Sequence, residues 1–329
     1  MKDTFGRTIT YLRVSVTDRC DFRCTYCMAE DMTFLPRQEI LSFEEMERIC
    51  TAFINRGVTK IRLTGGEPLV RHGIMDLIAQ LSHHLKTGAL KELTLTTNGS
   101  QLSKRADQLA ELGVKRINVS LDTLNAARFA EITRHGKLET VLAGLEAAKQ
   151  AGLKVKINTV ALKGQTDEEL DDLLQFVADN GFDLTFIETM PLGEIGGSRV
   201  DHYLPLTEVR ANIAKRWTIE ESDYNSGGPA RYVDVAETGK RIGFITPLSH
   251  GFCESCNRMR LTCKGTLFMC LGQDGNVDLR EVVRSSESNE PLQAAIDKAL
   301  NLKPEGHEFI IEEGRDGPAL NRHMSVTGG

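Results

Sequence analysis

A helix, a glycine stop and a strand follow one another in residues 42–68, which read SFEEMERICTAFINRGVTKIRLTGGEP. Ser42 and Glu45 have the spacing of a capping box, which predicts that a helix begins directly after Ser42. The Asn-Arg-Gly sequence at 55–57 ends this helix, since glycine is favoured just past a last helical turn. A β-rich run at 60–63 and the turn TGGEP follow. The segment therefore predicts one helix–strand unit whose strand ends in a polar, glycine-rich turn.

The same alternation recurs through the first two-thirds of the chain. Thr166 and Glu169 have the spacing of a second capping box. Repeated strand–helix units with short loops imply a parallel sheet with right-handed crossovers. Further β-rich runs predict strands at 12–16, 93–96, 116–121, 154–160 and 184–188. Helical spacing predicts helices at 43–55, 74–85, 104–112, 138–151 and 168–180.

The number of units leaves two α/β architectures open, an open doubly wound sheet and a partial barrel. About six units are fewer than the eight of a complete (β/α)8 barrel. Barrel enzymes build their sites at the carboxyl ends of the strands, and polar or glycine-rich residues collect there in this chain. We therefore expect a partial (β/α)6 TIM-like barrel. The residues at the strand ends are 64–68, 96–99, 120–122, Asn158 and 188–190.

The pattern changes after Met190, where a glycine-rich stretch at 191–198 begins. A helix is expected at 206–217 and a loop at 226–229, and short strand-like runs follow between 243 and 278. We predict two parts, a core over residues 1–195 and a loop-rich C-terminal extension over residues 196–329.

Composition excludes several classes of protein. The 329 residues include 46 acidic and 40 basic side chains, and the net charge of −6 argues against a general nucleic-acid coat. No apolar run approaches the ~18 residues of a membrane span, and the first residues lack the apolar stretch of a signal peptide. We expect a cytoplasmic protein with neither nucleic acid nor membrane as a partner. The eight cysteines fall mostly in two tight clusters, which in such a chain indicates metal or redox chemistry.

The first cluster is Cys20-x3-Cys24-x2-Cys27, directly after the first predicted strand. Thiolate ligands select iron–sulfur centres or zinc. An ordinary four-iron centre uses four cysteines, so three would leave one iron open to an external ligand. A zinc site and a redox-active cysteine pair remain as alternatives.

This motif, with Tyr26 before its last cysteine, resembles the signature of the radical S-adenosylmethionine (SAM) superfamily. Gly65-Gly66-Glu67-Pro68 resembles the glycine-rich SAM-contacting motif of the same superfamily. The resemblance implies a partial barrel of the radical SAM type and a [4Fe–4S] cluster that chelates SAM. It also implies that one electron cleaves SAM to methionine and a 5′-deoxyadenosyl radical.

The second cluster is Cys253-x2-Cys256-x13-Cys270, with Cys263 inside the gap. Four cysteines could form a zinc ribbon, although these spacings are not the paired C-x2-C pattern of such ribbons. The segment 257–260 reads Asn-Arg-Met-Arg, and no acidic residue occurs between Cys256 and Cys270. A cationic patch beside a metal centre indicates an anionic ligand.

Together with the radical SAM core, this second motif resembles the GTP 3′,8-cyclase family of molybdenum cofactor biosynthesis. The resemblance runs from about Tyr11 to the end of the chain, where Gly328-Gly329 matches a terminal double glycine that in this family enters the active site. It implies a catalytic role for Gly328 and Gly329. A frayed tail is the alternative for these two residues.

The resemblance also implies ligands for each group. Cys263 and Cys50 have no family role and are interpreted as ordinary thiols, although spacing alone would allow Cys263 as a ligand. The SAM cluster would be held by Cys20, Cys24 and Cys27, and a second [4Fe–4S] cluster, with an open iron for the guanine of GTP, by Cys253, Cys256 and Cys270. SAM would be contacted by Tyr26, Gly66, Ser120 and Met190. GTP would be contacted by Arg13, Arg62, Thr96, Lys156, Arg258, Met259 and Arg260.

The chemistry of the proposed GTP contacts agrees with these roles. Arginine forks and a lysine point charge balance the three to four negative charges of a triphosphate. Arg13, Arg62 and Lys156 lie within predicted strands, where inward-facing side chains would reach the barrel lumen. A buried charge needs a partner, which a nucleotide would supply. A solvated surface is the alternative for each residue.

The implied reaction begins with hydrogen abstraction from C3′ of the GTP ribose, and C3′ then bonds to C8 of guanine. The product would be 3′,8-cyclo-7,8-dihydro-GTP, which passes to cyclic pyranopterin monophosphate synthase, and a flavodoxin- or ferredoxin-type reductase would supply electrons. The protein would be a monomer or a homodimer. A radical SAM enzyme acting on a peptide and a zinc-stabilised binding module remain as rival interpretations.

Overall fold

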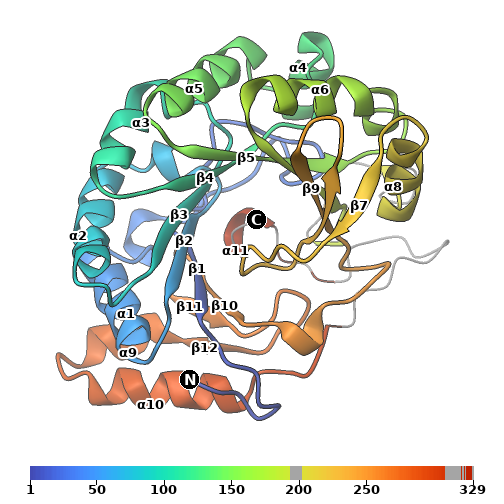
Figure 1. Ribbon diagram of the computed structural model, residues 1–329. Helices are drawn as coiled ribbons and strands as arrows, with labels where there is room; N and C mark the ends of the chain where they lie inside the picture. The colour runs from blue at the N-terminus through green and yellow to red at the C-terminus, as the bar shows by residue number, and fades with distance from the viewer. Residues whose placement is uncertain (193–201, 308–319, 321, 323, 328–329) are drawn as a thin grey trace.

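The computed structural model describes residues 1–192, 202–307, 320, 322 and 324–327. Within this part, strands curve round a common axis and most helices lie outside them (Figure 1). The sheet has twelve strands in the order β12-β11-β10-β1-β2-β3-β4-β5-β6-β9-β8-β7. The first six are β1 (Tyr11–Ser15), β2 (Lys60–Thr64), β3 (Glu92–Thr97), β4 (Arg116–Ser120), β5 (Lys154–Ala161) and β6 (Asp183–Glu188). The others are β7 (Ile219–Ser222), β8 (Arg231–Val235), β9 (Lys240–Ile245), β10 (Arg258–Leu261), β11 (Thr266–Phe268) and β12 (Asn276–Asp278).

The central strands confirm the parallel partial barrel expected from the sequence. β1 to β6 pair in parallel and in chain order. The C-terminal third adds one parallel strand at each edge of this set, β10 beside β1 and β9 beside β6. Antiparallel strands follow outside these, β11 and β12 at one end and β8 and β7 at the other. The sequence could not predict the pairing of β10 with β1, because it joins segments nearly 250 residues apart.

The helices of the core also lie where helical spacing placed them, with ends shifted by at most two residues. Four helices in the described part were not predicted, α4, α9, α10 and α11, and neither were strands β7 and β8. The core helices are α1 (Phe43–Asn55), α2 (Ile74–Lys86), α3 (Leu102–Glu111), α4 (Ala126–Thr133), α5 (Leu138–Gln150) and α6 (Leu170–Asn180). The C-terminal helices are α8 (Leu206–Ala214), α9 (Leu279–Ser285), α10 (Glu290–Asn301) and α11 (Met324–Thr327).

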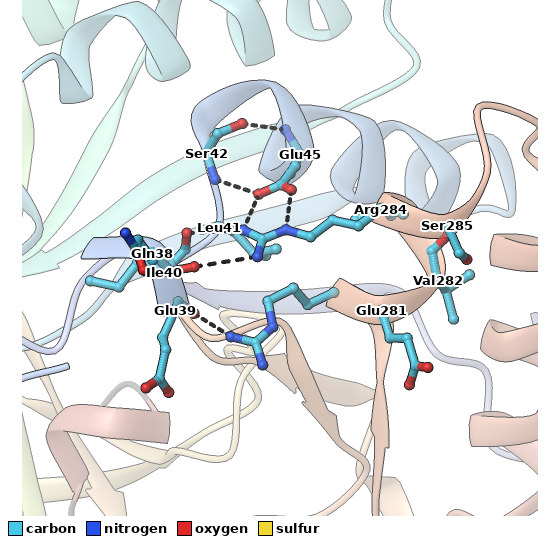
Figure 2. A network of polar contacts seen from close by, with 12 residues as sticks. Gln38, Glu39, Ile40, Leu41, Ser42, Glu45, Glu281, Val282, Arg284 and Ser285 are labelled. Atoms are coloured by element: carbon cyan, nitrogen blue, oxygen red, sulfur yellow. Dashed lines mark hydrogen bonds and ion pairs between the residues drawn. The ribbon is translucent and has the colours of Figure 1, made fainter. Parts of the chain in front are cut away.

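The capping box at the start of α1 is confirmed. The backbone N–H of Ser42 donates to Glu45 Oε2 at 2.6 Å, and the N–H of Glu45 donates to Ser42 Oγ at 3.2 Å. Figure 2 shows that Arg284 of α9 also reaches this corner, where it donates to Glu45 Oε1 at 2.6 Å and to the carbonyl of Ile40 at 3.4 Å. The first core helix is thereby fastened to the C-terminal extension.

The second capping box, at Thr166 and Glu169, was wrong. Helix α6 begins at Leu170, and no side chain caps it. The Glu169 carboxylate instead accepts from Thr123 Oγ1 at 2.6 Å and from Arg128 Nη1 at 2.6 Å. These donors, which include a cation, compete for Glu169 against the single backbone N–H that a capping box would offer.

Alternation along the strands separates an apolar outer face from a polar inner one. Successive side chains of a strand point to opposite faces of the sheet. Leu12, Ile61 and Leu63 are fully buried in the hydrophobic core that the sheet shares with the helices. Arg13 directly follows Leu12, and Arg62 stands between Ile61 and Leu63. Both arginines line an inner cavity. No helix in the described ranges is both long and apolar enough to cross a membrane.

Candidate active site

The three cysteines of the first motif meet in one cavity at the carboxyl ends of the barrel strands. They lie on the loop after β1, and all three are half-buried. The backbone N–H of Cys27 donates to the carbonyl of Cys24 at 2.9 Å, which closes a turn between two of the thiols. All four predicted SAM contacts line the same cavity, namely Tyr26, Gly66, Ser120 and Met190.

Gly65 and Gly66 bring the turn after β2 against the loop that carries the cysteines. A Cβ atom on Gly66 would come within 2.3 Å of the Arg19 carbonyl oxygen, and one on Gly65 within 2.5 Å of the Thr17 oxygen. The N–H of Gly66 donates to the Thr17 carbonyl at 2.8 Å. Only glycine fits at these two positions, because any side chain would push the two loops apart.

Glu67 joins the turn after β2 to the end of β3. Its buried carboxylate accepts from Thr97 Oγ1 at 2.8 Å and from the backbone N–H groups of Leu69 at 3.0 Å and Asn98 at 2.6 Å. Burial raises the pKa of Glu67 to about 7, although these hydrogen bonds act in the opposite direction. Asn98 in turn donates through Nδ2 to Asp21 at 2.7 Å, beside Cys20.

Asp122 orients the aromatic residue of the cysteine motif. Tyr26 donates its hydroxyl to Asp122 Oδ2 at 2.6 Å, and the other carboxylate oxygen accepts from the Val160 N–H at 2.8 Å. Burial raises the pKa of Asp122 to about 6, which the hydrogen bonds from Tyr26 and Val160 only partly offset. The ring of Tyr26 is therefore held in place at the wall of the cavity.

The second set of cysteines, Cys253, Cys256 and Cys270, lines a separate cavity at the other end of the barrel. Cys253 and Cys256 precede β10, which runs parallel to β1, whereas Cys270 follows the antiparallel strand β11. These cysteines therefore lie at the amino end of β10, while the first motif follows the carboxyl end of β1. The cavity encloses about 1080 Å³ of space not filled by atoms, its open mouth included. A nucleotide-sized ligand fits such a volume.

The two cavities are adjacent, because four residues line both of them. Asn158 and Ile187 come from β5 and β6, Met190 follows β6, and Met324 begins the short helix α11. Figure 1 shows α11 inside the ring of strands rather than outside with the other helices. A ligand in one cavity would thus be separated from a ligand in the other by no more than these shared side chains.

Buried cations gather in the second cavity. Adjacent strands place Arg260, Arg13 and Arg62 side by side, since Arg13 pairs in register with both of the others. The expectation that these side chains and Lys156 face the lumen is confirmed. The solvated-surface alternative is therefore excluded for the five cations of the cavity, each at most 9% exposed: Arg13, Arg62, Lys156, Arg258 and Arg260.

Several polar atoms of this cavity fit a polar or anionic ligand. In the described part of the chain, Arg62 Nε, Arg258 Nε and the Tyr11 hydroxyl are buried without a hydrogen-bond partner. Lys156 Nζ donates to Tyr232 Oη at 2.9 Å. Burial lowers the pKa of Lys156 to about 7, and the nearby arginines Arg62 and Arg116 add to this effect. A bound polyanion would satisfy these donors and favour the charged lysine.

The donor sets also fit iron–sulfur clusters. Each cavity offers three thiols, which are the ligands that such clusters prefer. In the first cavity the buried Thr96 hydroxyl also has no hydrogen-bond partner among the described residues. Within those residues, no three histidine, cysteine or carboxylate side chains converge closely enough to hold a single metal ion. A four-iron cluster differs in that each cysteine binds a different iron atom.

The thiols of the two cavities have different electrostatic surroundings. Burial, together with the carboxylates of Glu67 and Asp21, raises the pKa of Cys20 to about 12. Burial also acts to raise the pKa of Cys256, but Arg258 and Lys303 outweigh it, so that this pKa is lowered. The thiolate is therefore favoured at Cys256 and disfavoured at Cys20.

Two predicted GTP contacts, Thr96 and Met259, do not present their side chains to the second cavity. Thr96 lines the first cavity rather than the second. The side chain of Met259 is fully buried in the hydrophobic core, so any contact with a nucleotide would come from its backbone. Gly328 and Gly329 fall outside the described residues. Cys50 and Cys263 are both buried in the core and line neither cavity.

The structure also identifies residues that sequence reasoning missed. Tyr11, Asn158 and Met324 line the cavities, and Tyr232 holds Lys156. Tyr11 stands two residues before Arg13 on the same strand face, and this spacing could have identified it. Asn158 is one of the polar residues that the sequence placed at the strand ends, but the sequence assigned it no ligand. No sequence pattern distinguishes Tyr232 or Met324.

Comparisons with known proteins agree with both halves of the site. A model of the radical SAM superfamily matches residues 14–177, and a model described as Molybdenum Cofactor Synthesis C matches residues 182–309. The crystal structure of Streptococcus suis SuiB bound to S-adenosylmethionine superposes with a TM-score of 0.61 at 18% identity, covering 97% of this chain and 77% of that one. This likeness supports the radical SAM fold.

Two relatives named GTP 3′,8-cyclase match the whole chain. The protein of Agrobacterium fabrum is 61% identical over 329 residues, which cover 100% of this chain and 94% of that one. The protein of Mesorhizobium japonicum is 61% identical, with 100% and 99% covered. Identity at this level over the full length shows the family, and that family implies a [4Fe–4S] cluster and SAM. The chain belongs to the GTP 3′,8-cyclase family of radical SAM enzymes, which acts in molybdenum cofactor biosynthesis.

Proposed function

We propose that the chain converts GTP to 3′,8-cyclo-7,8-dihydro-GTP, the first step of molybdenum cofactor biosynthesis. The observation that carries this proposal is that the two cavities adjoin, with Asn158, Ile187, Met190 and Met324 lining both. A SAM molecule at one end of the lumen and a nucleotide at the other would lie in contact across these residues.

At the first end, we assign Cys20, Cys24 and Cys27 as the ligands of the SAM-binding cluster. When bound there and reduced by one electron, the cluster and SAM supply a 5′-deoxyadenosyl radical that abstracts hydrogen from the substrate. Tyr26, held by Asp122, provides a fixed aromatic surface beside that position. Gly66, Ser120 and Met190 complete the wall and are proposed as SAM contacts.

At the second end, we assign Cys253, Cys256 and Cys270 as ligands of a second [4Fe–4S] cluster whose open iron receives the guanine. The triphosphate is proposed to lie against the five cations of the cavity. Among the described residues the buried Nε atoms of Arg62 and Arg258 have no hydrogen-bond partner, and they favour an anion strongly because little water competes there. Thr96 and the backbone of Met259 are the remaining proposed GTP contacts.

The lumen between these ends excludes water from the reacting atoms. Ile187, Met190 and Met324 present apolar groups at the junction of the cavities. Arg260 Nη1 donates to the Thr327 carbonyl at 3.4 Å, which fixes the end of α11 beside the cations. The next two residues of the chain are Gly328 and Gly329, and we propose that they act in the same active site.

Several wider assignments belong to the same proposal. A reductase of the flavodoxin or ferredoxin type would supply electrons, and cyclic pyranopterin monophosphate synthase would take the product. The enzyme would work in the cytoplasm as a monomer or homodimer. Residues 1–195 would form the SAM-binding part and residues 196–329 the part that carries the second cluster.

The test is an anaerobic incubation of reconstituted protein with SAM, dithionite and GTP. We expect GTP to be consumed and 5′-deoxyadenosine to form in equal amounts, and ATP in place of GTP to give neither product above background. Formation of 5′-deoxyadenosine without loss of GTP would favour the peptide-modifying rival. A colourless protein that contains zinc and no iron would favour the binding module.

A further inference from the structure

Lys303 is a buried lysine that no step of the proposed reaction uses. It follows helix α10 and is only 3% exposed. Its Nζ donates to the carbonyl of Met269 at 2.6 Å and to that of Arg258 at 3.1 Å, and lies 3.7 Å from Cys256 Sγ. Met269 directly precedes Cys270. One ammonium group therefore joins the two chain segments that carry Cys256 and Cys270.

Two further cations hold the backbone around the same cysteines. Arg7 donates to the carbonyl of Cys253 at 2.9 Å and to that of Pro304 at 2.6 Å, so that it ties Cys253 to the segment of Lys303. Arg322 donates to the carbonyl of Leu271 at 3.0 Å, next to Cys270. Lys303 differs from both arginines because its hydrogen bonds include a cysteine sulfur.

Burying the Lys303 ammonium group is unfavourable unless negative charge at the site compensates for the lost hydration. A buried ammonium loses its hydration, and two carbonyls compensate this loss only in part. Among the described residues no carboxylate lies within ion-pair distance of Lys303. Three thiolates around a four-iron core leave a net negative charge, and one-electron reduction makes it more negative. A fixed positive charge beside a ligating sulfur stabilises the reduced state, and charge and hydrogen bonds at the sulfurs are known to set cluster potentials.

We propose that Lys303 is a positioning residue of the second iron–sulfur site. It joins the Cys256 and Cys270 segments in the geometry that binds the cluster, and its charge raises the reduction potential of that cluster. This inference rests on the proposed second cluster, and it adds a residue from outside the cysteine motifs to the second site.

The test compares Lys303→Met with Lys298→Met in the reconstituted full-length enzyme. Lys298 lies in the last turn of α10 and is exposed, so its variant removes one charge at a distance from the cysteines. Reduction is followed by electron paramagnetic resonance against applied potential, and the second cluster is recognised by the change that added GTP makes to its signal. We expect Lys303→Met to lower the equilibrium constant for its reduction at least tenfold, which is about 59 mV for one electron. Lys298→Met should leave it unchanged.

Each other outcome also decides the matter. An unchanged potential in Lys303→Met, with about eight irons bound, would overturn the inference. Loss of four irons in Lys303→Met would support it if Lys303→Arg, which keeps the charge, binds eight, and would overturn it if Lys303→Arg also binds four. About four irons in the unmodified protein would instead refute the proposed second cluster itself.

Discussion

The two cysteine cavities each offer three thiols but differ in the charges that lie near them. In the first, burial raises the pKa values of Cys20 and Cys24, and the carboxylates of Glu67, Asp21 and Asp122 act in the same direction. In the second, Arg258 and Lys303 lower the pKa of Cys256. Carboxylates disfavour added electrons at the first site, and cations favour them at the second. The first site therefore favours a cluster of low reduction potential, which is a strong reductant. The second site favours the binding of an anionic ligand.

The two cavities also differ in which part of the fold builds them. The first uses strand ends that follow one another in the chain, so its lining residues come from the core, with Met324 of α11 as the exception among the described residues. The second combines β1, β2 and β5 with β10 and with segments near residues 7, 303 and 322. The edge strands β9 and β10 are thus what brings the second cavity against the first.

Removing one cysteine from each site should have the largest effect and separate their roles. Both Cys24→Ala and Cys256→Ala should lower the iron content from about eight to about four per chain. Cys24→Ala should abolish SAM cleavage, whereas Cys256→Ala should retain GTP-independent SAM cleavage. Iron analysis and 5′-deoxyadenosine formation measure both effects. Equal loss of SAM cleavage in the two variants would show that the sites are not distinct.

The cations of the second cavity should matter for GTP and not for SAM. Replacing both Arg258 and Arg260 by alanine removes two charge-assisted contacts worth roughly 1.5–3 kcal/mol each, so we expect GTP binding to weaken at least about 100-fold. SAM cleavage without GTP should be spared. Equilibrium dialysis under anaerobic conditions measures GTP binding. Wild-type affinity in the double variant would show that the triphosphate does not bind at this end of the lumen.

The carboxylate that faces Tyr26 should give the first site a pH signature. Burial raises the folded-state pKa of Asp122 to about 6 from 3.8, so ionising it costs stability as the pH rises from about 4 to 6. Asp122→Asn removes this cost, because its Oδ1 still accepts from the Val160 N–H while its Nδ2 donates to the Tyr26 hydroxyl, which then becomes the acceptor. Relative to wild type, the variant should gain up to about 3 kcal/mol in the free energy of unfolding between pH 4 and pH 8. Urea unfolding at both pH values measures this, and a pH-independent difference would contradict it.

The smallest effect is expected at Cys263, which lies in the gap of the second motif. Its side chain is fully buried in the hydrophobic core and lines neither cavity. Cys263→Ala should therefore leave the iron content at about eight per chain. Loss of four irons would show that Cys263, and not one of the three assigned cysteines, belongs to the ligand set.

Sequence reasoning identified the first cavity better than the second. Strand alternation, glycine stops and the spacing of Cys20, Cys24 and Cys27 are local features, and the structure has the corresponding elements within two residues. The pairing of β10 with β1 joins residues that are far apart in the chain, and no pattern in the sequence indicates it. Lys303 contacts mainly backbone carbonyls, which every residue has, so no partner in the sequence could reveal it. Glu169 shows the converse, since a local capping pattern was overridden by Thr123 and Arg128.

Transfer of a single atom tests most directly whether the two cavities form one active site. GTP deuterated at C3′ is incubated anaerobically with the reconstituted enzyme, SAM and dithionite, and the 5′-deoxyadenosine is analysed by mass spectrometry. We expect deuterium in the 5′-deoxyadenosine and loss of GTP in equal measure, because the SAM end and the nucleotide end share Asn158, Met190 and Met324. Unlabelled 5′-deoxyadenosine with intact GTP would show that the nucleotide does not meet SAM in this lumen.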